Sequence, residues 1–287
     1  MDKAHKLIWQ AKMQMKTNWI NAKRLLEAGI KEFPNEKELY LVLANLYLKQ
    51  DLHKKAIRNF QEALKLSPNE NYILFKTGNC FLMLDEYRLA IDQYNKCSES
   101  FPELIYNKAF AYYKLGKITT SISLMKQISS SAINTEMPLI FMTELHFLNH
   151  EYSKAISFIE EAERRFGKQG NLSYLKALAY YHQQYWLKAF VALQEADKMK
   201  LDTPNFLLNY GIVANKIGKT ELAIDQLLRY IRLHNNDPQG YAELINIYLE
   251  HNRIEEANFV AQQAKKNSLF SLALSLSYNK LAKMKNS

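Results

Sequence analysis

The feature that most constrains this chain is a small side chain that recurs at a nearly constant interval. These residues are Ala22, Ala56, Ala90, Ser121, Ala155, Ala189, Ala223 and Ala257. Every interval is 34 residues except the one between Ala90 and Ser121, which is 31 residues. A fixed period of this length is typical of repeat proteins, in which each repeat is one supersecondary unit stacked on its neighbours. The chain is therefore expected to consist of stacked repeat units.

Each unit is predicted to form two antiparallel helices joined by a short turn. With the recurring small residue placed at position 20, position 8 is also mostly small, as in Ala44 and Gly78, and position 11 is mostly large, as in Tyr47 and Phe81. Two helices approach closely only where one presents a small side chain and the other fills the gap. Turn-forming pairs stand near positions 14 to 17, namely Gln50-Asp51, Leu84-Asp85, Leu115-Gly116, Asn149-His150, Ile217-Gly218 and His251-Asn252.

This pattern resembles the tetratricopeptide repeat family over nearly the whole chain. The stretch from Tyr40 to Pro68, YLVLANLYLKQDLHKKAIRNFQEALKLSP, is close to the family consensus, and Pro34, Pro68 and Pro102 end the first three units as the family prefers. The resemblance implies an all-α fold, a right-handed superhelical solenoid of antiparallel helix pairs with a C-terminal capping helix. We predict a single array with units near 3–36, 37–70, 71–101, 102–135, 136–169, 170–203, 204–237 and 238–271 and a cap at 272–287.

In this family one face of each first helix, at positions 2, 6, 9 and 13, lines an inner groove. Here that face is aromatic and aliphatic in the middle units and carries amides and charges towards both ends. Aromatic rings supply contact area at low entropy cost, and Asn can both donate to and accept from a peptide backbone. We predict that the partner-binding residues are Tyr72, Phe75, Asn79, Tyr106, Asn107, Phe110, Tyr113, Phe141, Phe147, Tyr174, Tyr181 and Asn209. In the alternative interpretation, neighbouring first helices bury these rings against each other.

Some members of the family clamp the C-terminal carboxylate of a partner with lysine and arginine side chains from three successive units. This chain has the two amides of that pattern, Asn79 and Asn107, but Phe75, Met137 and Phe141 stand where the cations are expected. A clamp of that type is therefore not predicted.

The sequence predicts no catalytic residues, no cofactor and no metal ligands. Gly218-Lys219-Thr220 resembles the end of a phosphate-binding loop, but Val213 occupies the place of the required first glycine. His146 and His150 have the spacing of a metal-binding pair but lack the HExxH context, and we expect His146 to be buried in the core. We predict a non-enzymatic scaffold or adaptor that binds a peptide or helix of a partner protein.

Two alternative functions depend on the ends of the chain. The first helix is apolar nearly all round, and we expect Ala4, Ile8, Ala11 and Met15 to lie opposite its partner helix, where they could support self-association. The net charge is +9, and residues 265–287 hold five lysines and no acid, which suits nucleic acid or an anionic surface. We favour the interpretation that these lysines complement a helix dipole and keep the cap solvated, so nucleic acid is not the expected partner.

The first twenty residues do not suggest a leader or an anchor. Lys3, Lys6, Lys12 and Lys16 interrupt the apolar positions, and no run approaches the length of a membrane span. We therefore expect a cytoplasmic protein without membrane insertion. Cys80 and Cys97 are the only cysteines, and they are expected to be small hydrophobic residues rather than a disulfide.

The recurring small residues generate a first testable prediction. Ala90→Leu should lower the free energy of unfolding by about 1–3 kcal/mol, because the added methyl groups overpack a close helix contact. Denaturant unfolding measures this change. Lys54→Leu, on the predicted solvated side of a second helix, should change stability by less than about 0.5 kcal/mol, and equal effects of the two substitutions would contradict the helix-pair interpretation.

Overall fold

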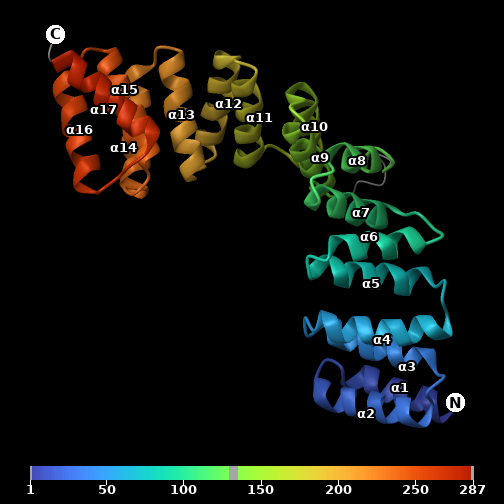
Figure 1. The fold of residues 1–287 in the computed structure, drawn as a ribbon. Coiled ribbons are helices and arrows are strands. Elements are labelled where there is room, and N and C mark those ends of the chain that lie inside the picture. Colours follow the sequence, from blue (N-terminus) through green and yellow to red (C-terminus); the bar gives the residue numbers. More distant parts are fainter. Residues whose placement is uncertain (1, 129–134, 286–287) are drawn as a thin grey trace. The chain divides into compact units, whose positions relative to one another are not determined.

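The computed structural model describes residues 2–128 and 135–285, and every regular element in those residues is a helix (Figure 1). The helices are α1 (Lys3–Gln14), α2 (Trp19–Glu32), α3 (Lys37–Leu48), α4 (His53–Leu66), α5 (Asn71–Met83), α6 (Tyr87–Lys96), α7 (Pro102–Lys114), α8 (Ile118–Met125), α9 (Met137–Leu148), α10 (Tyr152–Phe166), α11 (Gly170–His182), α12 (Trp186–Lys198), α13 (Pro204–Lys216), α14 (Thr220–Leu233), α15 (Pro238–Glu250), α16 (Ile254–Lys266) and α17 (Leu272–Lys285). The end of the predicted 102–135 unit, at 129–134, and the last two residues of the predicted cap lie outside the described residues.

The chain divides into two compact units. The N-terminal unit is Met1–Pro138 and holds α1 to α8, and the C-terminal unit is Leu139–Ser287 and holds nearly all of α9 together with α10 to α17. Within each unit the helices pack as consecutive pairs, such as α3 on α4 and α11 on α12, and each pair also packs on the next. The fold is therefore an all-α array of stacked helix pairs. The single array of the sequence analysis, and its superhelical hand, stay predictions.

The recurring small residues lie where the two helices of a pair meet. Ala22, Ala56, Ala90, Ala155, Ala189, Ala223 and Ala257 are all fully buried. Ser121 is also fully buried, and its Oγ donates to the carbonyl of Ala109 at 2.8 Å, so the serine at this position is satisfied within its own helix pair. Across the contact, a Cβ at Gly211 would lie 2.7 Å from Leu227 Cγ. The close helix approach predicted from the sequence is confirmed.

The turn inside each pair has a recurrent geometry at position 15. The residues there adopt a positive φ in seven pairs, namely Asp51, Asp85, Gly116, His150, Gln184, Gly218 and Asn252. The N–H of the following residue donates to the carbonyl of position 11, as Lys219 N does to Ala214 O at 2.8 Å. This is the Schellman arrangement that ends a helix. All six predicted turns are confirmed, and the turn at Gln184 was missed because glutamine carries no turn signal.

The C-terminal helix α17 packs on α15 and α16. Leu274 and Leu281 are buried, and Ser277 Oγ donates to Asn246 Oδ1 at 3.1 Å. The predicted capping helix is therefore present within the described residues. It packs more extensively on α15 than on α16.

The expectation for the first helix is wrong in its orientation. Ala4, Ile8 and Ala11 are buried rather than exposed, because α1 contacts both α2 and α3 and turns its narrow stripe of small residues towards them. The apolar residues of α1 that face solvent are Trp9 and Met13, with exposed fractions of 55% and 62%. Because α1 is apolar on nearly all sides, its sequence has no polar stripe that would identify the face exposed to solvent.

The turn geometry generates a second prediction. Gly218→Ala should lower the free energy of unfolding by about 1 kcal/mol, because an L-residue strains the left-handed backbone at φ 76° while its Cβ meets no neighbour. Gln184→Gly at φ 62° should raise stability by a few tenths to about 1 kcal/mol. Chemical denaturation measures both.

Gly170→Ala serves as the matched control, because Gly170 begins α11 without a positive φ and a Cβ there would meet only ordinary contacts at 3.4 Å. This substitution should be neutral or stabilising. A loss of stability at Gly170 as large as that at Gly218 would contradict the assigned backbone strain.

Candidate functional site

An amide pair joins two first helices of the N-terminal unit. Asn107 Nδ2 on α7 donates to Asn79 Oδ1 on α5 at 2.9 Å. The hydroxyl of Tyr94 on α6 donates to the same oxygen at 2.7 Å. Tyr94 is buried, and burial raises the pKa of its hydroxyl, which therefore stays protonated and remains a donor. These two bonds fix the carbonyl of Asn79 and so orient both amide groups, and they use neither Asn79 Nδ2 nor Asn107 Oδ1.

An apolar cavity of about 510 Å³ adjoins this amide pair within the N-terminal unit. Its lining residues are Phe75, Pro102, Glu103, Tyr106, Asn107, Ile128, Thr135, Met137 and Pro138. Phe75 is held edge-on against Phe101, with ring centroids 5.0 Å apart. Among the described lining residues the one charged side chain is that of Glu103. The structure thus brings Phe75, Asn79, Tyr106 and Asn107 together, as the sequence analysis grouped them.

The other predicted residues of the N-terminal unit flank this site. Tyr72 is 46% exposed, its hydroxyl donates to Asn45 Oδ1 at 3.3 Å, and the ammonium of Lys76 lies 5.6 Å from its ring centroid. Phe110 and Tyr113 are half-buried on α7, with ring centroids 5.9 Å apart. Their rings are partly accessible and partly packed, so both interpretations of the sequence pattern hold in part here.

In the C-terminal unit, Tyr174 and Asn209 form a polar pair of a different kind. Asn209 Nδ2 donates to the Tyr174 hydroxyl and to the carbonyl of Asn205, each at 2.8 Å. Both amide hydrogens of Asn209 are thereby used within the protein. Tyr174 also contacts Phe206 edge-on, and burial raises the pKa of its hydroxyl. Compared with the Asn79–Asn107 pair, this pair has less hydrogen-bonding capacity left for a ligand.

Phe141 does not belong to an exposed surface. Its side chain is only 4% exposed, and it lies in α9 beside the buried residues Met142 and Leu145. The helix is apolar on nearly all sides, so the 3.6-residue periodicity could not separate its inner face from its outer face. The assignment of Phe141 to a groove is therefore corrected to the core.

Sequence reasoning missed an aromatic cluster at the turns of the fifth and sixth pairs. Tyr152 and His182 stack with ring centroids 4.9 Å apart and planes 6° apart, and Phe147 meets both rings edge-on. Tyr181 contacts His182 and Trp186 edge-on. Burial, and then the neighbouring His150, lower the pKa of His182. Phe147 and Tyr181 share position 12 of their units, and Tyr152 and Trp186 share position 17. This recurrence of aromatic residues at two positions of successive units could have revealed the cluster.

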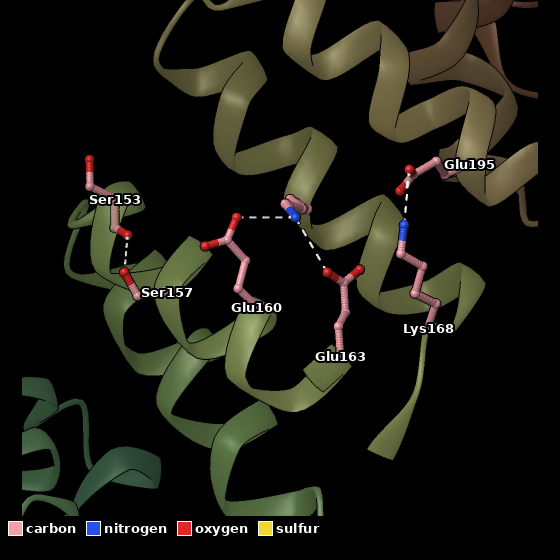
Figure 2. A network of polar contacts seen from close by, with 7 residues as sticks. Ser153, Ser157, Glu160, Glu163, Lys168 and Glu195 are labelled. Atoms are coloured by element: carbon pink, nitrogen blue, oxygen red, sulfur yellow. Dashed lines mark hydrogen bonds and ion pairs between the residues drawn. The ribbon is translucent and has the colours of Figure 1, made fainter. Parts of the chain in front are cut away.

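A network of ion pairs crosses from α10 to α11 and α12 in the C-terminal unit. The Lys176 ammonium lies between two carboxylates, 3.2 Å from Glu160 and 3.3 Å from Glu163. Figure 2 shows Glu160 and Glu163 on α10, and the Lys168–Glu195 ion pair, whose charged atoms are 3.1 Å apart. Burial alone would lower the pKa of Lys176, but the two carboxylates outweigh burial and raise it. Its side chain is only 18% exposed. The network therefore serves as a cross-link between helices, without an activated nucleophile or base.

Within the described ranges 2–128 and 135–285, no three His, Cys, Asp or Glu side chains lie close enough together to share a metal ion. His146 is buried, bonded through Nδ1 to Glu151 Oε2 at 2.7 Å and stacked on Phe158. Cys80 and Cys97 are free thiols, and burial raises the pKa of Cys80 to about 11. His146 is thus a satisfied core residue, as predicted.

No helix in the described part of the chain combines the length and the apolar character needed to cross a bilayer. The cytoplasmic location stays a prediction.

Two sequence models of the tetratricopeptide repeat match this chain, one at residues 37–70 and the other at residues 72–104. No curated protein matches the sequence. A tetratricopeptide repeat protein from Parabacteroides merdae is structurally similar, at 15% identity over 86% of this chain and 98% of its own, with a TM-score of 0.58.

Two further solved structures are similar to this chain. YrrB, described as a repeat protein of the same kind with an unusual peptide-binding site, is 16% identical over 68% of this chain and 97% of its own, with a TM-score of 0.55. A chain of the Cut9–Hcn1 hetero-tetramer of the APC/C is 15% identical over 97% of this chain and 55% of its own, with a TM-score of 0.53. At such identities the likeness shows the fold alone.

The bond between Tyr94 and Asn79 generates a third prediction. Asn79→Ala should lower the free energy of unfolding by about 1–3 kcal/mol, because it leaves the buried Tyr94 hydroxyl without its acceptor. In a Tyr94→Phe background the same substitution should cost less than about 1 kcal/mol, because no hydroxyl is then orphaned. Urea unfolding of the wild type, the two single variants and the double variant forms a double-mutant cycle. If Asn79→Ala lowers the free energy of unfolding equally in both backgrounds, the Tyr94 hydroxyl does not support the amide pair.

Proposed function

We propose that the chain belongs to the tetratricopeptide repeat family and is a non-enzymatic scaffold that binds an extended peptide segment of a partner protein. The proposed site is the surface formed by Asn79, Asn107 and the adjoining apolar cavity of the N-terminal unit. It uses the aromatic face of α5 and α7, including Tyr72, Phe110 and Tyr113, as flanking contact area.

The observation that carries this proposal is the orientation of the amide pair. Asn79 Nδ2 offers donors and Asn107 Oδ1 offers an acceptor, while Tyr94 and the mutual bond hold both groups in place. A peptide backbone presents the complementary acceptor and donor at every residue, so such a pair binds main chain without regard to sequence. Fixed polar groups also reduce the ordering cost of binding.

The cavity beside the pair supplies selectivity. Its volume of about 510 Å³ and its apolar lining suit a bulky aliphatic or aromatic side chain of the bound segment. Glu103 on its rim disfavours a carboxylate in the same place, which agrees with the missing cations of the carboxylate clamp. The bound segment is therefore an internal, apolar stretch rather than an acidic C-terminus.

The C-terminal unit is a poorer candidate for this role. Both amide hydrogens of Asn209 are used within the protein, and Phe141 is buried. The unusual peptide-binding site of YrrB, a protein of similar fold, supports peptide binding by an array of this kind.

A peptide library displayed on phage tests the proposal. Segments selected on the full chain should contain a bulky apolar residue, and Asn107→Ala should weaken their binding by about 10-fold, as expected for one lost hydrogen bond with a peptide. Isothermal titration calorimetry with the synthetic peptides measures the affinities.

The matched control is Asn209→Ala, the same chemical change in the C-terminal unit. It should leave the affinities unchanged. If the selected peptides bind Asn107→Ala as tightly as the wild type, or lose affinity on Asn209→Ala instead, the proposed site is wrong.

A further inference from the structure

A second candidate interaction surface lies in the C-terminal unit, on helices that do not contribute to the proposed peptide site. The helices α14 and α16, with α15 as the floor, enclose a groove of about 570 Å³, named here the α14–α16 groove. Leu228 of α14 and Phe259 of α16 line it with exposed fractions of 37% and 61%. Two large apolar side chains thus meet solvent on opposite walls of one groove.

These apolar residues are not required by the repeat. The position of Phe259 is filled by Arg58 in the second unit and Asp92 in the third, and that of Leu228 by Glu160 in the fifth. Polar side chains are therefore compatible with the fold at both places. Two exposed apolar side chains that share one groove form a contiguous apolar surface, which is the kind of surface that marks an interaction site.

The charged residues among the described lining of the α14–α16 groove are both acidic. Glu255 and Glu256 lie in the first turn of α16, and Glu256 accepts a hydrogen bond from Arg253 at 2.8 Å. An apolar floor with an acidic end suits an amphipathic helix that carries apolar anchors and basic flanks.

The first helix of the same chain has those properties. Trp9 and Met13 are exposed one turn apart on α1, with the exposed Lys6 on the same helix and the exposed Lys16 just after its end. Lys12 is also exposed and pairs with Glu38 of the same chain at 2.8 Å. No acidic residue occurs between Asp2 and Glu27. Trp and Met are enriched at protein interfaces, and Trp is frequent among the residues that dominate binding energy.

We propose that α1 of one copy docks into the α14–α16 groove of a second copy. Trp9 and Met13 occupy the apolar space between Leu228 and Phe259, and the lysines of α1 face Glu255 and Glu256. A contact between two α1 helices would instead bring their lysines together, which like-charge repulsion disfavours. The surfaces on the two copies differ, so the contact is heterologous and can extend from copy to copy as an open chain.

This assembly leaves the amide pair of α5 and α7 uninvolved, and the proposal is independent of peptide binding. A partner peptide would bind to α5 and α7, whereas a neighbouring copy would bind to α14, α15 and α16. The two proposals can therefore fail separately.

Sedimentation velocity of the full chain over a concentration series tests the proposal. The wild type should form species larger than a monomer, and their amount should fall as salt is raised, because charged rims contribute to the contact. Trp9→Ala and Phe259→Asp should each weaken association by about 30-fold or more. Both side chains are exposed, so circular dichroism should show unchanged helix content in each variant.

Mixing the two variants gives the decisive result. Trp9→Ala keeps an intact groove and Phe259→Asp keeps an intact α1, so an equimolar mixture should form a discrete 1:1 dimer that cannot extend. Leu187→Asp, at a residue of α12 that is 71% exposed outside the groove, should assemble like the wild type. A monomeric wild type, or a mixture that remains monomeric while each variant is folded, would overturn the proposal.

Discussion

Close contact between the two helices of each repeat is the interaction on which the rest of this structure depends. It requires a small residue at position 20 of each unit, which lies in the second helix, and Ala22, Ala56 and Ala90 meet that requirement with fully buried side chains. Because backbones approach at these points, the large residues beside them, such as Tyr94, reach across the pair and fill the remaining space. A single repeat cannot bury its remaining apolar face alone, so stacking of successive pairs follows from the same constraint.

The candidate peptide site is a consequence of this packing. Tyr94 fills the space beside Gly78 inside its pair, and from that position its hydroxyl reaches Asn79 on the first helix. The core residue therefore orients the surface residue, and Asn107 of the next first helix completes the pair. The Tyr174–Asn209 pair of the C-terminal unit has a different geometry, and it uses much of its hydrogen-bonding capacity on the protein itself.

The sequence predicted the features that are set by local chemistry. The spacing of the alanines gave the helix pairs, and Asp51 or Gly218 marked turns because few residues adopt a positive φ easily. Prediction failed for Phe141 in α9 and Ala4 in α1, because these helices have no polar face. When apolar residues occur on all sides of a helix, their periodicity does not show which side faces the core. It also missed the ring contacts around His182, which join residues about thirty positions apart in neighbouring repeats. The amide pair was grouped correctly, but the role of Tyr94 in orienting it depends on a tertiary hydrogen bond.

The central claim is that a core tyrosine holds a surface amide pair ready for a peptide backbone. The most direct measurement is an NMR titration that follows the side-chain amide resonances of Asn79, Asn107 and Asn209 as a selected apolar peptide is added. The account predicts that the Asn79 and Asn107 signals shift together with the peptide concentration while the Asn209 signal stays in place. Saturable binding with no change at Asn79 and Asn107 would contradict it.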